Sequence, residues 1–148
     1  MPVDERDIKI APVESDEDIV ASLPVMQGLH PQWSNAADYL AQIRKQIAGG
    51  YRLVLLRWRG EPAACAGFRC LDMLTRGHFM QIDDLVTAPE RRSLGLGATL
   101  FAWLVAEARR RGCARIDLDS RMSRGEAHRF YFRQGMTATS LHFMLPLQ

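Results

Sequence analysis

Hydrophobic and polar positions recur with two different periods along the chain, and each period predicts one kind of element. The strand period comes first, at residues 7–13. A helix then begins at Ser15, because a hydroxyl followed by three acidic residues suits the positive end of a helix. We expect this helix to end at about Pro24 or Gly28. A second helix begins near Ser34 or Asn35 and ends at Gly49-Gly50, with an apolar face of Tyr39, Leu40, Ile43 and Ile47.

The middle of the chain changes to a strand pattern. Short apolar runs lie at residues 52–58, 63–72 and 78–87, and turn residues join them at 59–62 and 75–77. Consecutive strands with short connections predict an antiparallel meander.

The last third begins with helical spacing after Pro89. The stripe of Leu100, Phe101, Leu104, Val105 and Ala108 ends in the basic residues 109–111 and Gly112, which is typical of a helix C-terminus. Residues 114–119 alternate as a strand. Ser123 and Glu126 then have the spacing of a capping box, which predicts a last helix through Gln134. The tail, 136–147, predicts one or two closing strands. The order βααβββαβαββ predicts an α+β fold around one mixed sheet.

Composition excludes several classes of protein. The 148 residues suit a single domain, 1–148, and the 47% hydrophobic and 24% charged residues exclude a disordered chain. A net charge of +2 argues against a basic protein that coats nucleic acid. No apolar run approaches the roughly 18–20 residues that span a bilayer, and the acidic N-terminus lacks the apolar core of a signal peptide. We expect a cytoplasmic protein with neither a membrane nor a nucleic-acid partner.

Cysteines and histidines show no metal-ligand spacing along the chain. Cys65, Cys70 and Cys113 form no CxxC pair, and the four histidines are scattered. We expect reduced thiols and no metal.

The segment 83–100 (DDLVTAPERRSLGLGATL) carries the strongest chemical signal. A predicted strand ends there, and a glycine-rich stretch opens a long helix. Gly95 and Gly97 allow a ligand to approach the backbone, and the free N–H groups of the first helical turn favour an anion. Arg91 and Arg92 add charge-assisted donors. These features predict a cradle for a pyrophosphate.

Three phosphate-binding patterns compete for this segment. A Walker loop requires Gly-Lys-Ser/Thr, which the chain lacks. A dinucleotide fingerprint requires a third glycine, where Leu100 stands, although Asp117 lies at a suitable distance. Residues 92–97 (RSLGLG) instead match the Arg/Gln-x-x-Gly-x-Gly/Ala signature, and residues 127–136 (AHRFYFRQGM) match AxxFYxxxGF except at Met136. With these motifs the chain resembles the GCN5-related N-acetyltransferase (GNAT) superfamily.

The resemblance implies a three-layer α/β/α fold, with a mixed, mostly antiparallel sheet and helices on both faces. It implies acetyl-CoA as co-substrate, with the pantetheine along the central strand and the pyrophosphate on backbone amides. The implied cofactor-binding residues are Leu85, Val86, Thr87, Arg91, Arg92, Ser93, Leu94, Gly95, Leu96, Gly97 and Ala98.

The implied reaction needs a base and an acid. A lysine-like amine has a pKa of about 10.4, so deprotonating it at pH 7 costs roughly 4–5 kcal/mol. Asp84, or else Asp83, is the candidate base, and strand alternation sends the two to opposite faces unless a bulge intervenes. At most one of them is therefore expected to face the substrate. Tyr131 occupies the position of the family's general acid, which protonates the leaving thiolate.

The acceptor is expected to be a primary amine on a small molecule. A protein N-terminal or lysine amine is the alternative within the same chemistry, and a non-catalytic acyl-CoA-binding regulator is the alternative from another class. Trp33, Tyr39 and Trp58 either border the acceptor pocket or pack as ordinary aromatics. The apolar tail is a candidate surface for a homodimer.

Overall fold

A computed structural model describes residues 2–148 of the chain. These residues form two compact units: the first ends at Asp117, and the second comprises Leu118–Gln148. The expectation that residues 1–148 make one domain stays a prediction.

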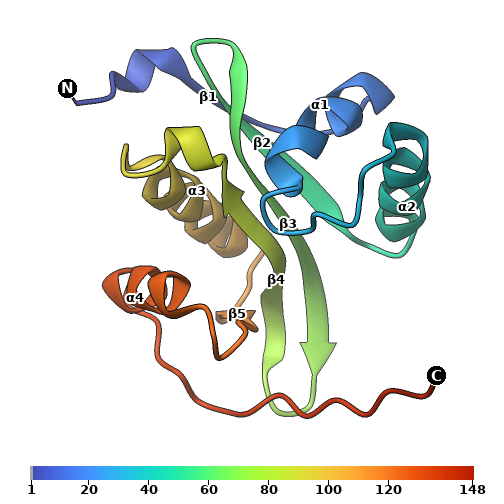
Figure 1. The fold of residues 1–148 in the computed structure, drawn as a ribbon. Helices are drawn as coiled ribbons and strands as arrows, with labels where there is room; N and C mark the ends of the chain where they lie inside the picture. Colours follow the sequence, from blue (N-terminus) through green and yellow to red (C-terminus); the bar gives the residue numbers. More distant parts are fainter. Residues whose placement is uncertain (1) are drawn as a thin grey trace. The chain divides into compact units, whose positions relative to one another are not determined.

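A five-stranded sheet forms the centre of the first unit, with the strands in the order β1-β2-β3-β4-β5 (Figure 1). The strands are β1 (Ile8–Pro12), β2 (Arg52–Trp58), β3 (Glu61–Met73), β4 (Gly77–Thr87) and β5 (Ile116–Leu118). The first four pair antiparallel, which confirms the meander predicted from the sequence. The segment that leads into β5 runs parallel to the start of β4. Ala114 N–H donates to the His78 carbonyl at 2.8 Å, and Met80 N–H donates to the Arg115 carbonyl at 3.0 Å. The sheet is therefore mixed, as expected.

Helices α1 (Asp16–Met26) and α2 (Ala36–Ala48) begin where the sequence predicts. The hydroxyl of Ser15 accepts a hydrogen bond from the backbone N–H of Asp18 at 3.1 Å, and the side chain of Asn35 accepts one from Asp38 N–H at 3.0 Å. Each bond satisfies one of the donors that a helix N-terminus leaves free. Pro24 lies inside α1, and the helix ends at Met26, midway between the two expected limits.

Strand alternation gives the sheet two apolar faces. In β2, Leu53 and Leu55 belong to the core that also contains buried residues of α1 and α2. Val54 and Leu56 are equally buried but point to the other face. There α3 (Leu96–Arg110) packs on β3 and β4, and Figure 1 shows it behind the sheet from α1. Helices cover both faces, as expected.

The second unit contains α4 (Gly125–Arg133) and the tail. Arg124 precedes α4 and no side chain of the described residues caps it, so the predicted Ser123 capping box is wrong. The closing strands predicted for the tail are also wrong, because residues 136–148, all of them described, form neither helix nor strand. Apolar alternation specifies a strand only where a neighbouring edge pairs with its backbone. Here the apolar side chains of the tail are exposed: Leu141, Phe143, Met144, Leu145 and Leu147.

Candidate active site

An irregularity in β4 determines where its two acidic side chains lie. In the β3–β4 register Gly67 pairs with Asp84 and Phe68 pairs with Ile82, so Asp83 is an extra residue in β4. Such a bulge interrupts the alternation of side chains. Asp83 and Asp84 consequently line one cavity instead of pointing to opposite faces. The expectation that at most one of them faces this region is wrong, because the bulge is present.

The cavity has a volume of about 310 Å³ and lies within the first unit. It is lined by the end of α1, the following loop, one face of α2, and β3 and β4: Met26, His30, Gln32, Trp33, Tyr39, Gln42, Ile43, Gln46, Arg69, Asp83 and Asp84. Trp33 and Tyr39 therefore border the cavity. Trp58 lies elsewhere, with the guanidinium groups of Arg59 and Arg91 4.7 and 4.8 Å from the centre of its ring.

Both carboxylate oxygens of Asp84 are held by side chains from other elements. Oδ1 lies 2.5 Å from Nε2 of His30, and Oδ2 accepts a 2.7 Å hydrogen bond from the hydroxyl of Tyr51. The Asp84 side chain is only 12% exposed, whereas that of His30 is 35% exposed. A carboxylate with so little exposure to water requires such partners. The Asp84 carboxylate is thus fixed, and its imidazole partner is the more accessible of the two.

Tyr51 reaches Asp84 because β3 has a glycine at the crossing point. A β-carbon built on Gly67 would lie 1.7 Å from the Tyr51 hydroxyl oxygen. Burial raises the pKa of Tyr51 well above 10, and the nearby charge of Asp84 raises it further. The phenol therefore keeps its proton at neutral pH and donates a hydrogen bond to the carboxylate.

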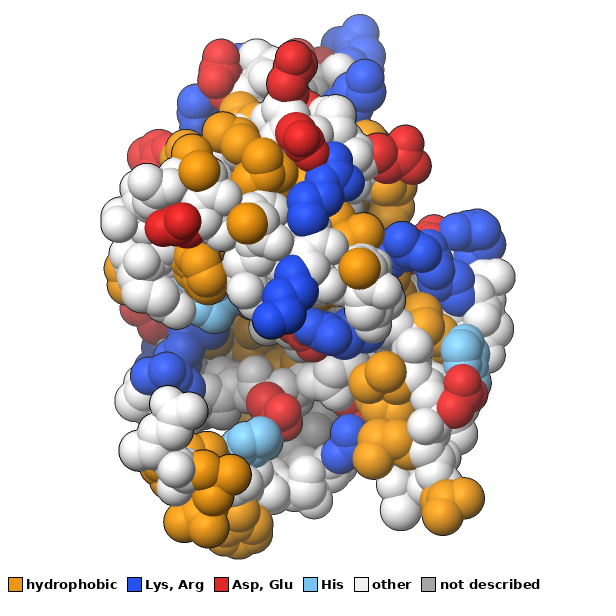
Figure 2. Space-filling model, turned by 90° about the vertical axis from the view of Figure 1, so that its right-hand side faces the viewer, with side chains coloured by type: hydrophobic (Ala, Val, Ile, Leu, Met, Phe, Trp, Pro, Cys, Tyr) orange, Lys and Arg blue, Asp and Glu red, His pale blue; other side chains and the backbone are white. Residues whose placement is uncertain are grey.

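Asp83 has a different environment. Its Oδ2 accepts a 2.6 Å hydrogen bond from Nε of Arg69, and the two side chains are 26% and 31% exposed. The Arg69 guanidinium also lies 5.5 Å from the centre of the Tyr51 ring. The cavity thus presents a partly exposed ion pair beside the less exposed Asp84. Figure 2 shows basic and acidic side chains interspersed over the face of the molecule where α2 lies.

The glycine-rich segment opens α3 as the sequence predicts. After the 3-10 turn Pro89–Arg91, both Ser93 (φ 63°) and Gly95 (φ 80°) adopt left-handed conformations. Thr99 N–H makes the first intrahelical bond, to the Gly95 carbonyl at 3.0 Å. Among the described residues no side chain caps this helix, so the N–H groups of residues 96–98 remain available to a ligand. Together with the exposed Arg92, this geometry fits a pyrophosphate.

The second half of β4 offers a backbone edge near the same loop. β5 has only three residues, whereas β4 has eleven. The segment just before β5 bonds to His78 and Met80, which lie at the start of β4. Leu85, Val86 and Thr87 pair with β3 on one side and lie beyond that short contact on the other. The edge suits the amide-bearing arm of a coenzyme A thioester.

Tyr131 lies on α4, in the second unit, whereas the acidic pair and the glycine-rich loop lie in the first. Burial raises its pKa, and the neighbouring Arg124 guanidinium acts in the opposite direction. The phenol is therefore protonated at neutral pH. His128, on the same helix, contacts the Arg121 carbonyl through Nε2 at 2.8 Å, which is a structural role.

Sequence reasoning missed His30 and Tyr51. Neither lies in a motif, and both reach Asp84 from more than thirty positions away in the chain. The glycine opposite Asp84 was the one available signal, and it becomes informative only once the strand register is known.

Comparisons with known proteins agree with this geometry. The sequence profile of the acetyltransferase (GNAT) family matches residues 18–136. An aminoalkylphosphonate N-acetyltransferase of Salmonella typhimurium is 36% identical over 63 residues, which span 43% of this chain and 41% of that protein. An uncharacterized N-acetyltransferase of Bacillus subtilis is 29% identical over 95% of this chain and 99% of its own length. A transcriptional regulator from Bacillus halodurans has the same fold, with a TM-score of 0.81 at 19% identity over 95% of this chain and 99% of that one.

The chain therefore belongs to the acetyltransferase (GNAT) family, whose members are acyl-CoA-dependent acetyltransferases that use acetyl-CoA as co-substrate. The family, the fold class and the enzyme class predicted from the sequence are confirmed. Among the described residues, no helix is both long and apolar enough to cross a membrane.

Proposed function

We propose that the protein transfers an acetyl group from acetyl-CoA to the primary amine of a small molecule, by direct attack within a ternary complex. The observation that carries this proposal is Asp84, a largely buried carboxylate held by His30 and Tyr51 at the wall of a cavity of about 310 Å³. A fixed negative charge beside an accessible cavity is suited to an ammonium group.

The cofactor would be held by two parts of the first unit. The amides at the start of α3 and the Arg92 guanidinium would bind its pyrophosphate, assisted by Arg91. Leu85, Val86 and Thr87 would pair with its pantetheine, and Ser93, Leu94 and Gly95 shape the loop. When bound, acetyl-CoA supplies a thioester as the electrophile.

The acidic pair would prepare the acceptor amine. Asp83 and Asp84 attract the ammonium form, and the pair of Asp84 and His30 accepts its proton, directly or through water. Asp84 keeps the imidazole in one orientation, and His30 is the more accessible partner. Deprotonation of such an amine costs roughly 4–5 kcal/mol at pH 7, and this is the cost that a base at this position would lower.

Tyr131 would hold the proton needed by the departing thiol. Its raised pKa keeps the phenol protonated across the neutral range, which a general acid requires.

Arg69 favours an acceptor that also carries an acidic group. It lines the cavity, and its Nε bonds to Asp83 while the planar guanidinium has further donors to offer. The Salmonella relative is named for aminoalkylphosphonates, which combine an amine with an anionic group. Aminoalkylphosphonates are therefore the first candidates among small amines.

The test is a screen for acetyl-CoA-dependent thiol release with aminoalkylphosphonates, amino acids, amino sugars, polyamines and short peptides. Asp84→Asn and Asp83→Asn are then assayed separately on the best acceptor, with the exposed Asp38→Asn as the matched control. We expect Asp84→Asn to lower kcat/KM by ~10²-fold or more and Asp38→Asn to change nothing. Full activity in both cavity variants at neutral and lower pH would refute the assignment of the base. Tight acetyl-CoA binding without turnover on any amine would instead favour a regulator, and turnover on peptides alone would favour a protein acceptor.

A further inference from the structure

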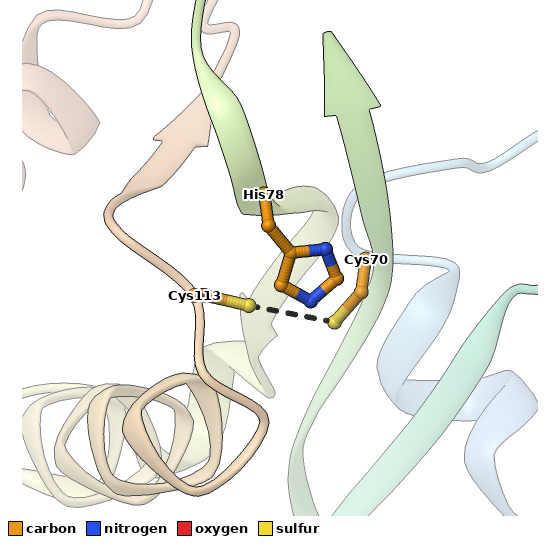
Figure 3. A group of neighbouring side chains, drawn as sticks. All are labelled: Cys70, His78 and Cys113. Atoms are coloured by element: carbon orange, nitrogen blue, oxygen red, sulfur yellow. Dashed lines mark hydrogen bonds between the residues drawn. The ribbon is translucent and has the colours of Figure 1, made fainter.

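A second cluster of reactive side chains lies in the first unit, apart from the residues that line the acceptor cavity. It consists of Cys70 on β3, Cys113 after α3, and His78 on β4 (Figure 3). One ligand atom from each residue lies within 4.8 Å of the other two, and all three side chains are partly buried. Nothing in the proposed acetyl transfer uses these residues.

The strand register explains why these residues meet. In the β3–β4 hairpin Cys70 pairs with Met80 and Asp72 pairs with His78. Cys70 and His78 are therefore diagonal neighbours on one face of the hairpin, at a separation that long side chains can bridge. Cys113 arrives from the adjacent chain, because the next residue, Ala114, donates its N–H to the His78 carbonyl at 2.8 Å.

We propose that Cys70, His78 and Cys113 form a zinc site. The two sulfur atoms lie 3.7 Å apart, and two thiolates bound to zinc at ~2.3 Å with a tetrahedral angle would be ~3.8 Å apart. Figure 3 shows Nε2 of His78 turned toward the two sulfurs. Two thiolates and an imidazole are a ligand set that binds zinc in preference to harder cations. They leave the fourth coordination position to water or another small ligand.

Asp72 supplies the outer hydrogen bond that such a site requires. Its Oδ1 lies 3.0 Å from Nδ1 of His78. A carboxylate bound to one imidazole nitrogen fixes the ring and directs the lone pair of the other nitrogen toward a metal. Asp72 is therefore a positioning residue: it acts through His78 and does not contact the metal.

The site would join three separate parts of the chain. The ligands come from both strands of the β3–β4 hairpin and from the connection between α3 and β5. A metal bound in the folded chain but not in the unfolded chain stabilises the fold. Because none of the three ligands lines the acceptor cavity, zinc here would act on stability and not as part of the transfer chemistry.

The test measures metal binding by the full chain, reduced and freed of metal. Zinc is titrated in competition with a chromophoric chelator, and Co²⁺ serves as an optical probe whose thiolate charge-transfer band reports sulfur ligation. We expect one zinc per chain. Cys70→Ser, Cys113→Ser and His78→Ala should each weaken binding at least ~10-fold, and Asp72→Asn should weaken it ~10–100-fold without removing the thiolate band. The controls Cys65→Ala and His142→Gln should bind as the parent does.

Circular dichroism of each apo variant checks that it is folded. The site is disproved if the reduced parent binds no stoichiometric zinc, or if Cys113→Ser, folded, binds it as tightly as the parent. A Cys70–Cys113 disulfide, found by mass spectrometry in protein that fails to bind zinc after reduction, would also overturn the proposal in favour of a redox pair. None of these readouts depends on acetyl transfer, so they stand apart from the proposed function.

Discussion

The hydroxyl oxygen of Tyr51 occupies the space where a side chain at Gly67 would begin. A β-carbon there would lie 1.7 Å from that oxygen and 2.1 Å from the ring carbon that bears it. Gly67 is also the residue that pairs with Asp84 across the β3–β4 ladder. The missing side chain thus admits the aromatic ring that donates a hydrogen bond to the buried carboxylate.

Gly67→Ala should therefore disturb both stability and activity. The added methyl group displaces the Tyr51 ring and breaks its 2.7 Å bond to Asp84. We expect a loss of ~1–3 kcal/mol in the free energy of unfolding, as for other overpacked cores, measured by urea denaturation. The acetyltransferase rate should fall in parallel.

Gly49→Ala is the matched control, because a β-carbon there would meet nothing closer than 3.5 Å. It should stay within ~0.5 kcal/mol of the parent. Tyr51→Phe in the Gly67→Ala background should not restore stability, since ring carbons also lie within 2.4 Å of the new methyl group. Restoration would show that the hydroxyl alone is in conflict.

Gly95→Ala should weaken acetyl-CoA binding. Gly95 has φ 80°, a conformation that costs a non-glycine residue ~1–2 kcal/mol, and it sets the loop that opens α3. Gly60 has φ 82°, and at both glycines a β-carbon would have no neighbour among the described atoms within 4 Å. Gly60→Ala should thus lose similar stability and bind acetyl-CoA normally by isothermal titration. Equal acetyl-CoA affinities for the two variants would show that the loop at Gly95 is not part of the binding site.

Tyr131→Phe should lower kcat by ~10²-fold and leave acetyl-CoA affinity nearly intact. Since burial raises the Tyr131 pKa above 10, the parent should hold this acid function to a pH above that of an ordinary tyrosine. Steady-state kinetics and titration of acetyl-CoA separate the two effects. A variant that loses affinity and keeps kcat would assign Tyr131 to packing.

Glu107 should make the free energy of unfolding decrease as the pH falls into the acidic range. The guanidinium groups of Arg110 and Arg111, at 2.9 and 2.7 Å, lower its pKa from 4.5 to about 2. The ionised carboxylate therefore stabilises the fold fully above pH 4.5, and this contribution disappears as the pH falls toward 2. After solvent screening we expect roughly 1 kcal/mol.

Urea denaturation at pH 7 and pH 3 measures this dependence. Glu107→Gln should be less stable than the parent at pH 7, and the difference should shrink at pH 3. The exposed Glu90→Gln should follow the parent at both values. A difference that grows on acidification would contradict the direction of the pKa change.

The helix starts and strands that were predicted correctly are those whose sequence signals depend only on neighbouring residues. The caps at Ser15 and Asn35 and the strand 52–58 lie where they were expected, because capping and alternation act over a few positions. The prediction of strands in the tail was wrong for the opposite reason. A strand needs an edge elsewhere in the fold to pair with, and the alternation of the tail's own residues does not specify that edge.

The candidate site was predicted in part. The glycine-rich loop and the acidic pair follow from motifs, but the bulge at Asp83 does not, because an inserted residue is visible only against its partner strand. His30 and Tyr51 were missed for the same reason. The expectation of no metal rested on spacing along the chain, whereas Cys70 and Cys113 meet through the packing of β4 beside the segment that follows α3.

The bulge in β4 makes the length of that strand as important as its composition. Deleting Asp83 would leave Ile82 opposite Phe68 and Asp84 opposite Gly67, so the ladder would become regular and the strand would keep its facing on both sides. The deletion would take one of the two carboxylates out of the cavity and leave the other in place. For protein engineering, the bulge is therefore the place where β4 can change its length by one residue, whereas an insertion or deletion in the regular part of the strand would reverse the facing of the positions beyond it.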